Sequence, residues 1–142
     1  MHEKSYQGFI ALIRSGKRLS TIFDRKLQEH EITLTQCEVI LSLADSGSVR
    51  QMDLAEQVHV KRNTLVPMLD RLEQQGWIKR QDNPDDQRSF FVVLTESGKK
   101  RAVSVRGLIS KIATELSQGM TPKETTSAIA YLDKLFKNIE EN

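Results

Sequence analysis

The fold is decided by residues 60–94, which read VKRNTLVPMLDRLEQQGWIKRQDNPDDQRSFFVVL. Residues 61–75 have a helical pattern, because Leu65, Leu69 and Leu72 fall within about 60° of one another on a helical wheel. Gly76 follows at the position where helices commonly end. Two strands are expected next, at 77–81 and 89–94, joined by the turn DNPDDQR. A helix followed by a hairpin in this order predicts a winged helix-turn-helix, which reads DNA rather than catalysing a reaction.

The polar face of the 61–75 helix carries the residues expected to contact bases. Recognition helices contact base edges mainly through their N-terminal residues. Asn63 and Thr64 have side chains that hydrogen-bond base edges, and Val66 or the Pro67 ring can touch a thymine methyl group. The alternative is an ordinary solvated face of a surface helix, which is common.

Basic residues of the same helix are expected to hold phosphates, which sets the register of a complex but not its sequence preference. They are Lys61, Arg62 and Arg71. Asp70 counts against close approach of a phosphate unless an arginine pairs with it, because two negative charges repel each other.

The turn between the strands carries the candidate wing residues Asp86, Gln87 and Arg88. An arginine at the edge of a hairpin suits insertion into a narrow minor groove, where the negative potential is enhanced. We expect Asp86 to hold the Arg88 guanidinium in a fixed direction. The competing interpretation is a plain polar turn, but a helix and a wing in direct succession favour DNA binding.

Amphipathic helices flank this lobe on both sides. A first helix is expected over residues 3–30, and a second one opens at a capping box formed by Thr35 and Glu38. A short extended piece at 48–50 and a third helix at 51–58 follow. Thr95 is expected to cap a fifth helix, and a second capping box at 121–124 opens a sixth. We predict a mainly α protein with a small β hairpin, as a single domain: a winged-helix lobe at 34–95 with long helical dimerisation regions at 1–33 and 96–142.

Composition limits the class of protein. The chain has 142 residues and a net charge of +2, and residues 50–106 hold 11 Lys and Arg against 8 Asp and Glu. The small basic excess therefore lies in the segment predicted to read DNA. The single cysteine excludes an internal disulfide, no apolar run approaches the ~20 residues of a membrane span, and the N-terminus lacks a secretory signal. We expect a cytoplasmic protein without membrane contact.

The sequence resembles the MarR family of bacterial transcription regulators. The resemblance rests on LTQ at 34–36, DLA at 53–55, TLVPMLDRL at 64–72, EQQGWIKR at 73–80, DNPDDQRS at 82–89 and VVLTESG at 92–98. The combined pattern is specific, and the flanking helices match in layout only. Residues 64–69 together with 73–76 are closest to the branch that contains the organic-peroxide sensors.

This resemblance implies a homodimer whose first, fifth and sixth helices interlock. Two winged-helix lobes would then bind a pseudo-palindromic site in double-stranded DNA, with recognition helices roughly one turn (~34 Å) apart. It also implies repression, relieved when a small phenolic or other lipophilic effector binds between the dimer helices and the DNA lobe. No cofactor and no metal ion is implied.

Two features depart from the family pattern. The peroxide-sensing branch has a reactive cysteine in its first helix, whereas this chain has only Cys37, in the first turn of the second helix. A helix N-terminus can lower a thiol pKa, so a redox-sensing role stands beside the alternative of a small buried residue. Lys61 lies where the family has a small capping residue and cannot cap a helix. The recognition helix is therefore expected to start at Asn63 or to fray, which would leave Pro67 nearer its first turn.

An enzyme is not expected. The histidines His2, His30 and His59 are scattered, and no metal spacing, nucleophile elbow or phosphate loop occurs. His30 is a candidate for an effector pocket, with an exposed histidine as the alternative, and Trp77 is expected in the core. The remaining alternative is a winged helix used for protein interaction, against which the basic residues of the helix and the wing count.

Overall fold

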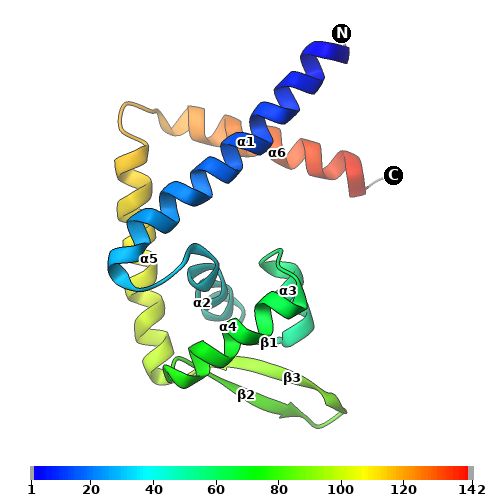
Figure 1. Ribbon diagram of the computed structural model, residues 1–142, viewed down its shortest axis with the longest axis vertical. Helices are drawn as coiled ribbons and strands as arrows, with labels where there is room; N and C mark the ends of the chain where they lie inside the picture. The colour runs from blue at the N-terminus through cyan, green and yellow to red at the C-terminus, as the bar shows by residue number, and fades with distance from the viewer. Residues whose placement is uncertain (1, 141–142) are drawn as a thin grey trace. The chain divides into compact units, whose positions relative to one another are not determined.

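Helices make up most of the computed structural model, which describes residues 2–140, with side chains from residue 6 onward (Figure 1). The elements, in chain order, are α1 (His2–Leu27), the 3₁₀ helix η1 (Gln28–His30), α2 (Leu34–Ser46), β1 (Ser48–Arg50), α3 (Gln51–Gln57), α4 (Arg62–Gln74), β2 (Ile78–Asn83), β3 (Asp86–Leu94), α5 (Glu96–Leu116) and α6 (Pro122–Glu140). They form two compact units that meet between Ile109 and Ser110. The first unit contains the whole winged helix-turn-helix.

A three-stranded antiparallel sheet belongs to the first unit, with strand order β1-β3-β2. Val49 of β1 pairs with Val92 of β3, so the extended piece predicted at 48–50 becomes an edge strand. The hairpin of β2 and β3 is longer than predicted, and a turn of only two residues separates its strands. The Asn83 side chain accepts the backbone N–H of Asp85 at 3.0 Å, an Asx turn that closes the hairpin. In Figure 1 this hairpin extends alongside α4 as the wing.

The core of the first unit fixes which face of α4 is left to solvent. Leu65, Leu69 and Leu72 are completely buried, as the helical wheel predicted. Other side chains of the core are supplied by α2, α3 and the sheet: Ile40, Leu43, Leu54, Ile78 and Val92. Burial of each such side chain contributes about 1.5–3 kcal/mol. Rotation of α4 about its axis would expose all three leucines and remove their contributions to stability.

The capping box of α2 lies two residues before the predicted one. Thr33, rather than Thr35, is the N-cap residue: its Oγ1 accepts the Gln36 N–H at 3.2 Å, and Gln36 Oε1 accepts the Thr33 N–H at 2.9 Å. A capping box accepts glutamine as well as glutamate at its last position. The prediction of a box at Thr35 and Glu38 is therefore wrong.

The predicted starts of α5 and α6 are confirmed. Thr95 Oγ1 accepts the Gly98 N–H at 3.0 Å. Thr121 Oγ1 accepts the Glu124 N–H at 3.3 Å, the Glu124 carboxylate accepts the Thr121 N–H at 2.7 Å, and Pro122 is the first residue of α6. Both helix starts are set by short local patterns, which is why the sequence predicts them.

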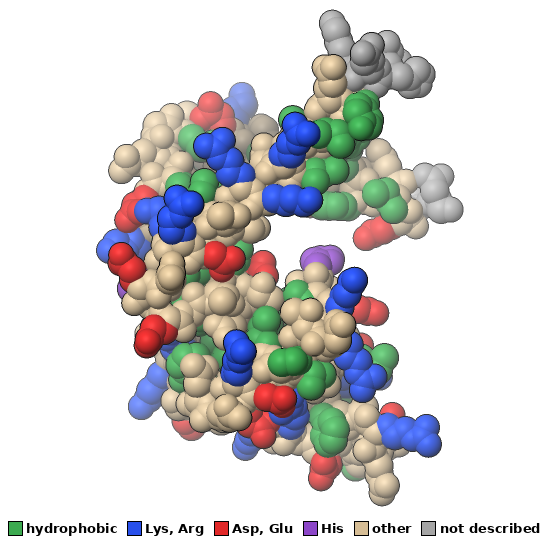
Figure 2. Space-filling model, in the orientation of Figure 1, with side chains coloured by type: hydrophobic (Ala, Val, Ile, Leu, Met, Phe, Trp, Pro, Cys, Tyr) green, Lys and Arg blue, Asp and Glu red, His purple; other side chains and the backbone are tan. Residues whose placement is uncertain are grey.

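Several exposed apolar side chains lie on each of the helices α1 and α6. Those of α1 are Tyr6, Phe9, Leu12, Ile13 and Leu19, and those of α6 are Ile129, Tyr131, Leu132, Phe136 and Ile139. Figure 2 shows hydrophobic side chains along the N-terminal part of α1. Exposed apolar stripes of this kind are typical of interaction surfaces. None of the helices described within residues 2–140 is long and apolar enough to cross a membrane.

Candidate nucleic-acid interface

The recognition helix α4 starts at Arg62, one residue before the predicted start. Lys61 is the N-cap residue, and its side chain makes no capping hydrogen bond. Its carbonyl nevertheless accepts the N–H of Leu65 at 3.0 Å, and the burial of Leu65 anchors the first turn. The expectation of a start at Asn63 is therefore wrong by one residue. Arg62, Asn63 and Thr64 occupy the first three helical positions and are exposed.

Pro67 lies in the interior of α4, as its sixth residue, rather than in the first turn. Because proline has no N–H, the carbonyl of Asn63 lacks the partner that a regular helix provides. The Pro67 ring is itself exposed. The helix therefore presents a ring and a carbonyl without a helical partner next to the side chains predicted to contact bases.

Two carboxylates on the flank of α4 nearest the hairpin pair with Arg80 of β2. Arg80 Nη2 lies 2.8 Å from Asp70 Oδ1, and Nη1 lies 2.9 Å from Glu73 Oε2. The same guanidinium donates to the Val66 carbonyl at 3.4 Å and to Gln51 Oε1 of α3 at 3.3 Å. Asp70 therefore pairs with an arginine, which is what it needs if a phosphate is to lie nearby. Sequence reasoning missed Arg80, because only the folded hairpin brings it to α4.

The wing carries Gln87 and Arg88 as exposed side chains on β3. Asp86 Oδ1 accepts the backbone N–H of Arg88 at 2.9 Å, so Asp86 fixes the hairpin backbone and not the guanidinium. That corrects the expected role of Asp86. Within the part of the chain that the structure describes, the Arg88 guanidinium has no ion-pair partner. Figure 2 shows Lys and Arg side chains over the winged-helix part, interspersed with acidic ones.

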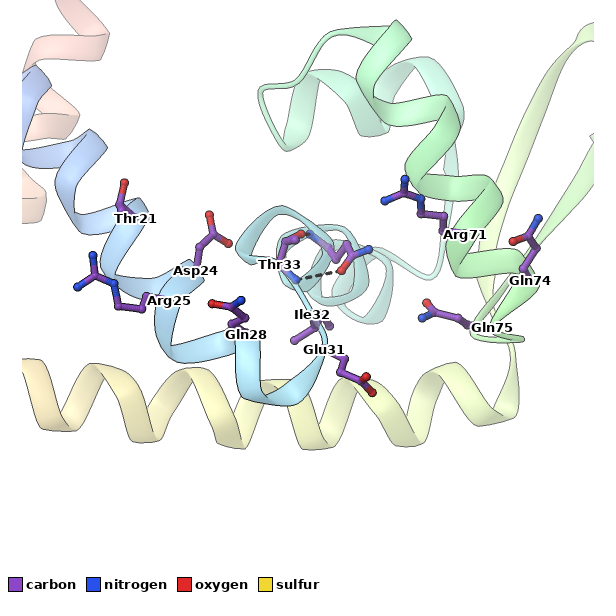
Figure 3. Close-up of a pocket in the computed structure, with 11 residues that line it drawn as sticks. Thr21, Asp24, Arg25, Gln28, Glu31, Ile32, Thr33, Arg71, Gln74 and Gln75 are labelled. Carbon is purple, nitrogen blue, oxygen red and sulfur yellow. Dashed lines mark hydrogen bonds between the residues drawn. The ribbon is translucent and has the colours of Figure 1, made fainter.

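Arg71 has a different environment from the other basic residues of α4. It lines an open cavity of about 790 Å³ whose opposite wall is the C-terminal part of α1, with the chain from η1 to the start of α2 between them (Figure 3). Arg71 therefore lies where it can contact a molecule in this cavity.

Cys37 lies in an apolar environment. Its side chain is completely buried, and this burial raises the pKa of the thiol to about 11, against smaller opposing effects such as the positive charge of Arg101. Burial and a raised pKa favour the interpretation of Cys37 as a small buried residue over a redox role. Cys37 lines a cavity of about 280 Å³ with mostly apolar side chains: Leu19, Phe23, Leu34, Leu41 and Ile109.

His30 is exposed and does not line either of these two cavities. Its backbone carbonyl accepts a hydrogen bond from Arg101 Nη2 of α5 at 3.2 Å. The same guanidinium lies 4.6 Å from the centre of the Trp77 ring. Trp77 is half-buried beneath this arginine, rather than a fully buried core residue as predicted.

A helix-turn-helix with a buried leucine face, an exposed polar N-terminal turn and an arginine-bearing hairpin defines a winged-helix DNA-binding protein. A family model for the MarR family matches residues 32–90. The multiple antibiotic resistance protein MarR of Salmonella typhimurium is 32% identical over 124 residues, which are 87% of this chain and 84% of that protein. The chain belongs to the MarR family of transcription regulators, and it is not an enzyme.

The predicted likeness to the organic-peroxide branch is also found. The organic hydroperoxide resistance transcriptional regulator of Bacillus subtilis is 31% identical over 121 residues, 83% of this chain and 81% of that protein. Among solved structures, a cysteine-to-serine mutant of MarR from E. coli complexed with operator DNA superposes with a TM-score of 0.77, at 27% identity, over 88% of this chain and 91% of that one. NadR in complex with 4-hydroxyphenylacetate has a TM-score of 0.72, at 28% identity, over 89% of each chain.

Proposed function

We propose that this MarR-family regulator is a homodimeric repressor that binds a pseudo-palindromic operator in the cytoplasm and is released by a small-molecule effector. The observations that carry the proposal are the exposed polar start of α4 and the exposed Arg88 on the wing, which has no ion-pair partner among the described residues. A MarR structure with operator DNA supports DNA as the partner.

Roles on DNA follow from side-chain chemistry. Asn63 and Thr64, exposed in the first turn, are proposed to read base edges, with the Pro67 ring against a thymine methyl group. Phosphates are proposed to be held by the basic side chains of the helix and the wing: Lys61, Arg62, Arg71 and Arg88. Asp86 and Gln87 complete the wing, Asp86 by holding its backbone. Arg80 neutralises Asp70 and Glu73, which would otherwise repel the same phosphates.

Dimerisation is proposed for the helical regions at 1–33 and 96–142, with residues 34–95 as the DNA-binding lobe. The support is the row of exposed apolar side chains on α1 and the second row on α6. A second copy of the chain would remove both rows from water, which is the main favourable term in stable association. Two lobes related by a two-fold axis then require a site with the same symmetry.

The effector is proposed to bind in the apolar cavity beside Cys37. A lining of aliphatic side chains with Phe23 suits a phenolic or other lipophilic molecule. NadR, whose structure contains 4-hydroxyphenylacetate, supports a phenol as the class. Cys37 would then act as part of the apolar wall and not as a redox group.

Selection of bound fragments from the source genome tests the proposal. We expect enriched fragments with an inverted repeat, transcription in vitro that falls when the protein is added, and recovery of transcription with a subset of phenols. A chain that sediments as a monomer at micromolar concentration contradicts the dimer. If the basic surface serves protein interaction instead, no genomic fragment is enriched.

A further inference from the structure

The cavity between α1 and α4 differs from the apolar one in the charged and polar side chains that line it. Of its eleven lining residues, Ile32 alone is an apolar type, and the others carry charges, carboxamides or hydroxyls. Its volume of about 790 Å³ falls within the ~300–1,000 Å³ of small-molecule sites. These side chains can bind a charged ligand.

Several lining groups are already engaged in the fold. Thr33 and Gln36 form the capping box of α2, and the Thr21 hydroxyl donates to the Lys17 carbonyl at 3.0 Å. Asp24 uses one oxygen, Oδ1, to accept the Leu34 N–H at 2.7 Å. The second carboxylate oxygen of Asp24 remains available to a ligand.

The groups not engaged lie on opposite walls and have opposite charges. Arg71 and Gln75 extend from α4 toward the α1 side of the cavity in Figure 3, and no hydrogen bond or ion pair within the described residues holds either side chain. Opposite Arg71, α1 supplies the Asp24 carboxylate, and the segment between α1 and α2 supplies Gln28 and Glu31. In Figure 3 the Glu31 carboxylate points away from Asp24. Arg25, the other cation of the lining, extends from α1 away from α4.

We propose that this cavity binds a small zwitterion of the amino-acid type. Its carboxylate pairs with the Arg71 guanidinium, whose planar fork matches a carboxylate, and its ammonium group is held by the free oxygen of Asp24. Gln28 and Gln75 offer both donors and acceptors to a polar side chain of the ligand. A plain anion would be repelled by the negative charges of Asp24 and Glu31, and a plain cation would be repelled by Arg71.

Binding of the ligand at this site also regulates the affinity for DNA. The ligand ties Arg71 of the recognition helix to α1, so Arg71 is no longer available to a phosphate. Linkage then requires that ligand and DNA each lower the affinity for the other. This second claim rests on the proposed DNA contact of Arg71, whereas the binding claim does not depend on it.

Calorimetric titration of the full chain without DNA tests the binding claim. The probes are the twenty amino acids one by one, with succinate and putrescine as single-sign controls, at constant ionic strength. We expect at least one polar amino acid to saturate the protein at up to ~10 mM, a weak but measurable affinity. If none binds, or if succinate or putrescine binds as well as the best amino acid, the proposal is overturned.

Single substitutions of lining residues test whether the ligand binds in this cavity. Asp24→Asn keeps an acceptor for the Leu34 N–H but removes the charge, and we expect affinity to fall about tenfold or more, as for loss of a charged hydrogen bond. Gln75→Glu, an exposed change beside Arg71, should weaken binding as well, and thermal unfolding checks that both variants fold. Asp45→Asn is the matched control, because Asp45 is an exposed carboxylate outside the cavity. Equal affinity of wild type, Asp24→Asn and Gln75→Glu for the amino acid contradicts the site.

The effect on DNA is measured separately, with the operator fragment and the amino acid together. A ligand that binds but leaves DNA affinity unchanged refutes the regulatory claim and leaves the site intact. Failure of the protein to bind any duplex would refute the proposed function and not the amino-acid site.

Discussion

Replacement of Arg80 by methionine removes the only cation that pairs with the two carboxylates on the hairpin flank of α4 among the described residues. The Arg80 side chain is 19% exposed, whereas those of Asp70 and Glu73 are 55% and 45% exposed. Methionine keeps most of the aliphatic stem, so the loss is mainly that of the guanidinium and its hydrogen bonds.

The magnitude follows from these contacts. Each ion pair is half-exposed and screened, so it contributes about 0.2–1 kcal/mol. The bonds to Val66 and Gln51 are 3.4 Å and 3.3 Å long and part-buried, which places each near the lower end of about 0.5–1.5 kcal/mol. We expect the free energy of unfolding to fall by about 1.5–3 kcal/mol.

Arg80→Met should lower the affinity for DNA by more than its effect on the free energy of unfolding alone would produce. Without Arg80, Asp70 and Glu73 place two negative charges without this partner on the helix that is proposed to approach phosphate. Each repels the duplex, and the repulsion weakens with salt. Affinity should therefore drop most at low ionic strength, and variant and wild type should converge as salt is added.

Urea unfolding followed by circular dichroism measures the first effect, with wild type and variants at one protein concentration. Arg106→Met is the control, because Arg106 forms a single exposed pair with Asp45 at 2.7 Å. We expect the control to lie within about 1 kcal/mol of wild type. If Arg80→Met is no less stable than Arg106→Met, or binds DNA as wild type does at low salt, Arg80 does not have the role described.

Three further tests concern packing, a cap and pH. Gly98→Ala places its new Cβ against the Trp77 carbonyl oxygen, and we expect the free energy of unfolding to fall by about 1–3 kcal/mol in the same urea series. Among the described residues, Gly107→Ala meets no atom within 4 Å apart from its own helix backbone, so the free energy of unfolding should rise by up to ~1 kcal/mol. Equal effects of the two substitutions would contradict the contact. Thr33→Ala should lower the free energy of unfolding by about 0.5–2 kcal/mol, and Thr35→Ala should lower it much less. The reverse order would indicate that Thr35, and not Thr33, caps α2. The pKa of Cys37 is raised in the fold from 9.0 to about 11, so the contribution of the neutral thiol to stability is complete below pH 9 and is lost as pH rises toward 11. The free energy of unfolding of wild type should therefore fall by roughly 2–3 kcal/mol relative to Cys37→Ala across that window. Parallel pH profiles of the two proteins would rule out the desolvated thiol.

Local patterns in the sequence predict the helices, the leucine face of α4 and the caps at Thr95 and Thr121, because each depends on residues within one or two turns. The cap of α2 shows the limit of such patterns. Two overlapping capping boxes occur, at Thr33 and at Thr35, and the sequence alone does not rank them. Asp24, from α1, accepts the N–H of Leu34, a tertiary contact that favours the earlier start.

The site is predicted less completely than the fold, because its details depend on non-local contacts. Arg80 meets α4 only after the hairpin has formed. Lys61 cannot cap a helix, yet α4 starts beside it, since the burial of Leu65 outweighs a missing cap. Cys37 is near a helix N-terminus, but desolvation by surrounding side chains sets its pKa. In each case tertiary packing overrides a correct local rule.

The central claim is that the start of α4 and the wing together read duplex DNA. Fluorescence anisotropy with an operator fragment and a scrambled duplex, across about 50–200 mM salt, tests it most directly. We predict that affinity falls linearly on a log–log plot, that Arg88→Ala weakens binding to both duplexes and lowers the slope by about 1, and that Asn63→Ala loses the preference for the operator. Affinity that does not depend on salt, or Arg88→Ala and Asn63→Ala proteins that bind both duplexes as wild type does, would contradict the account.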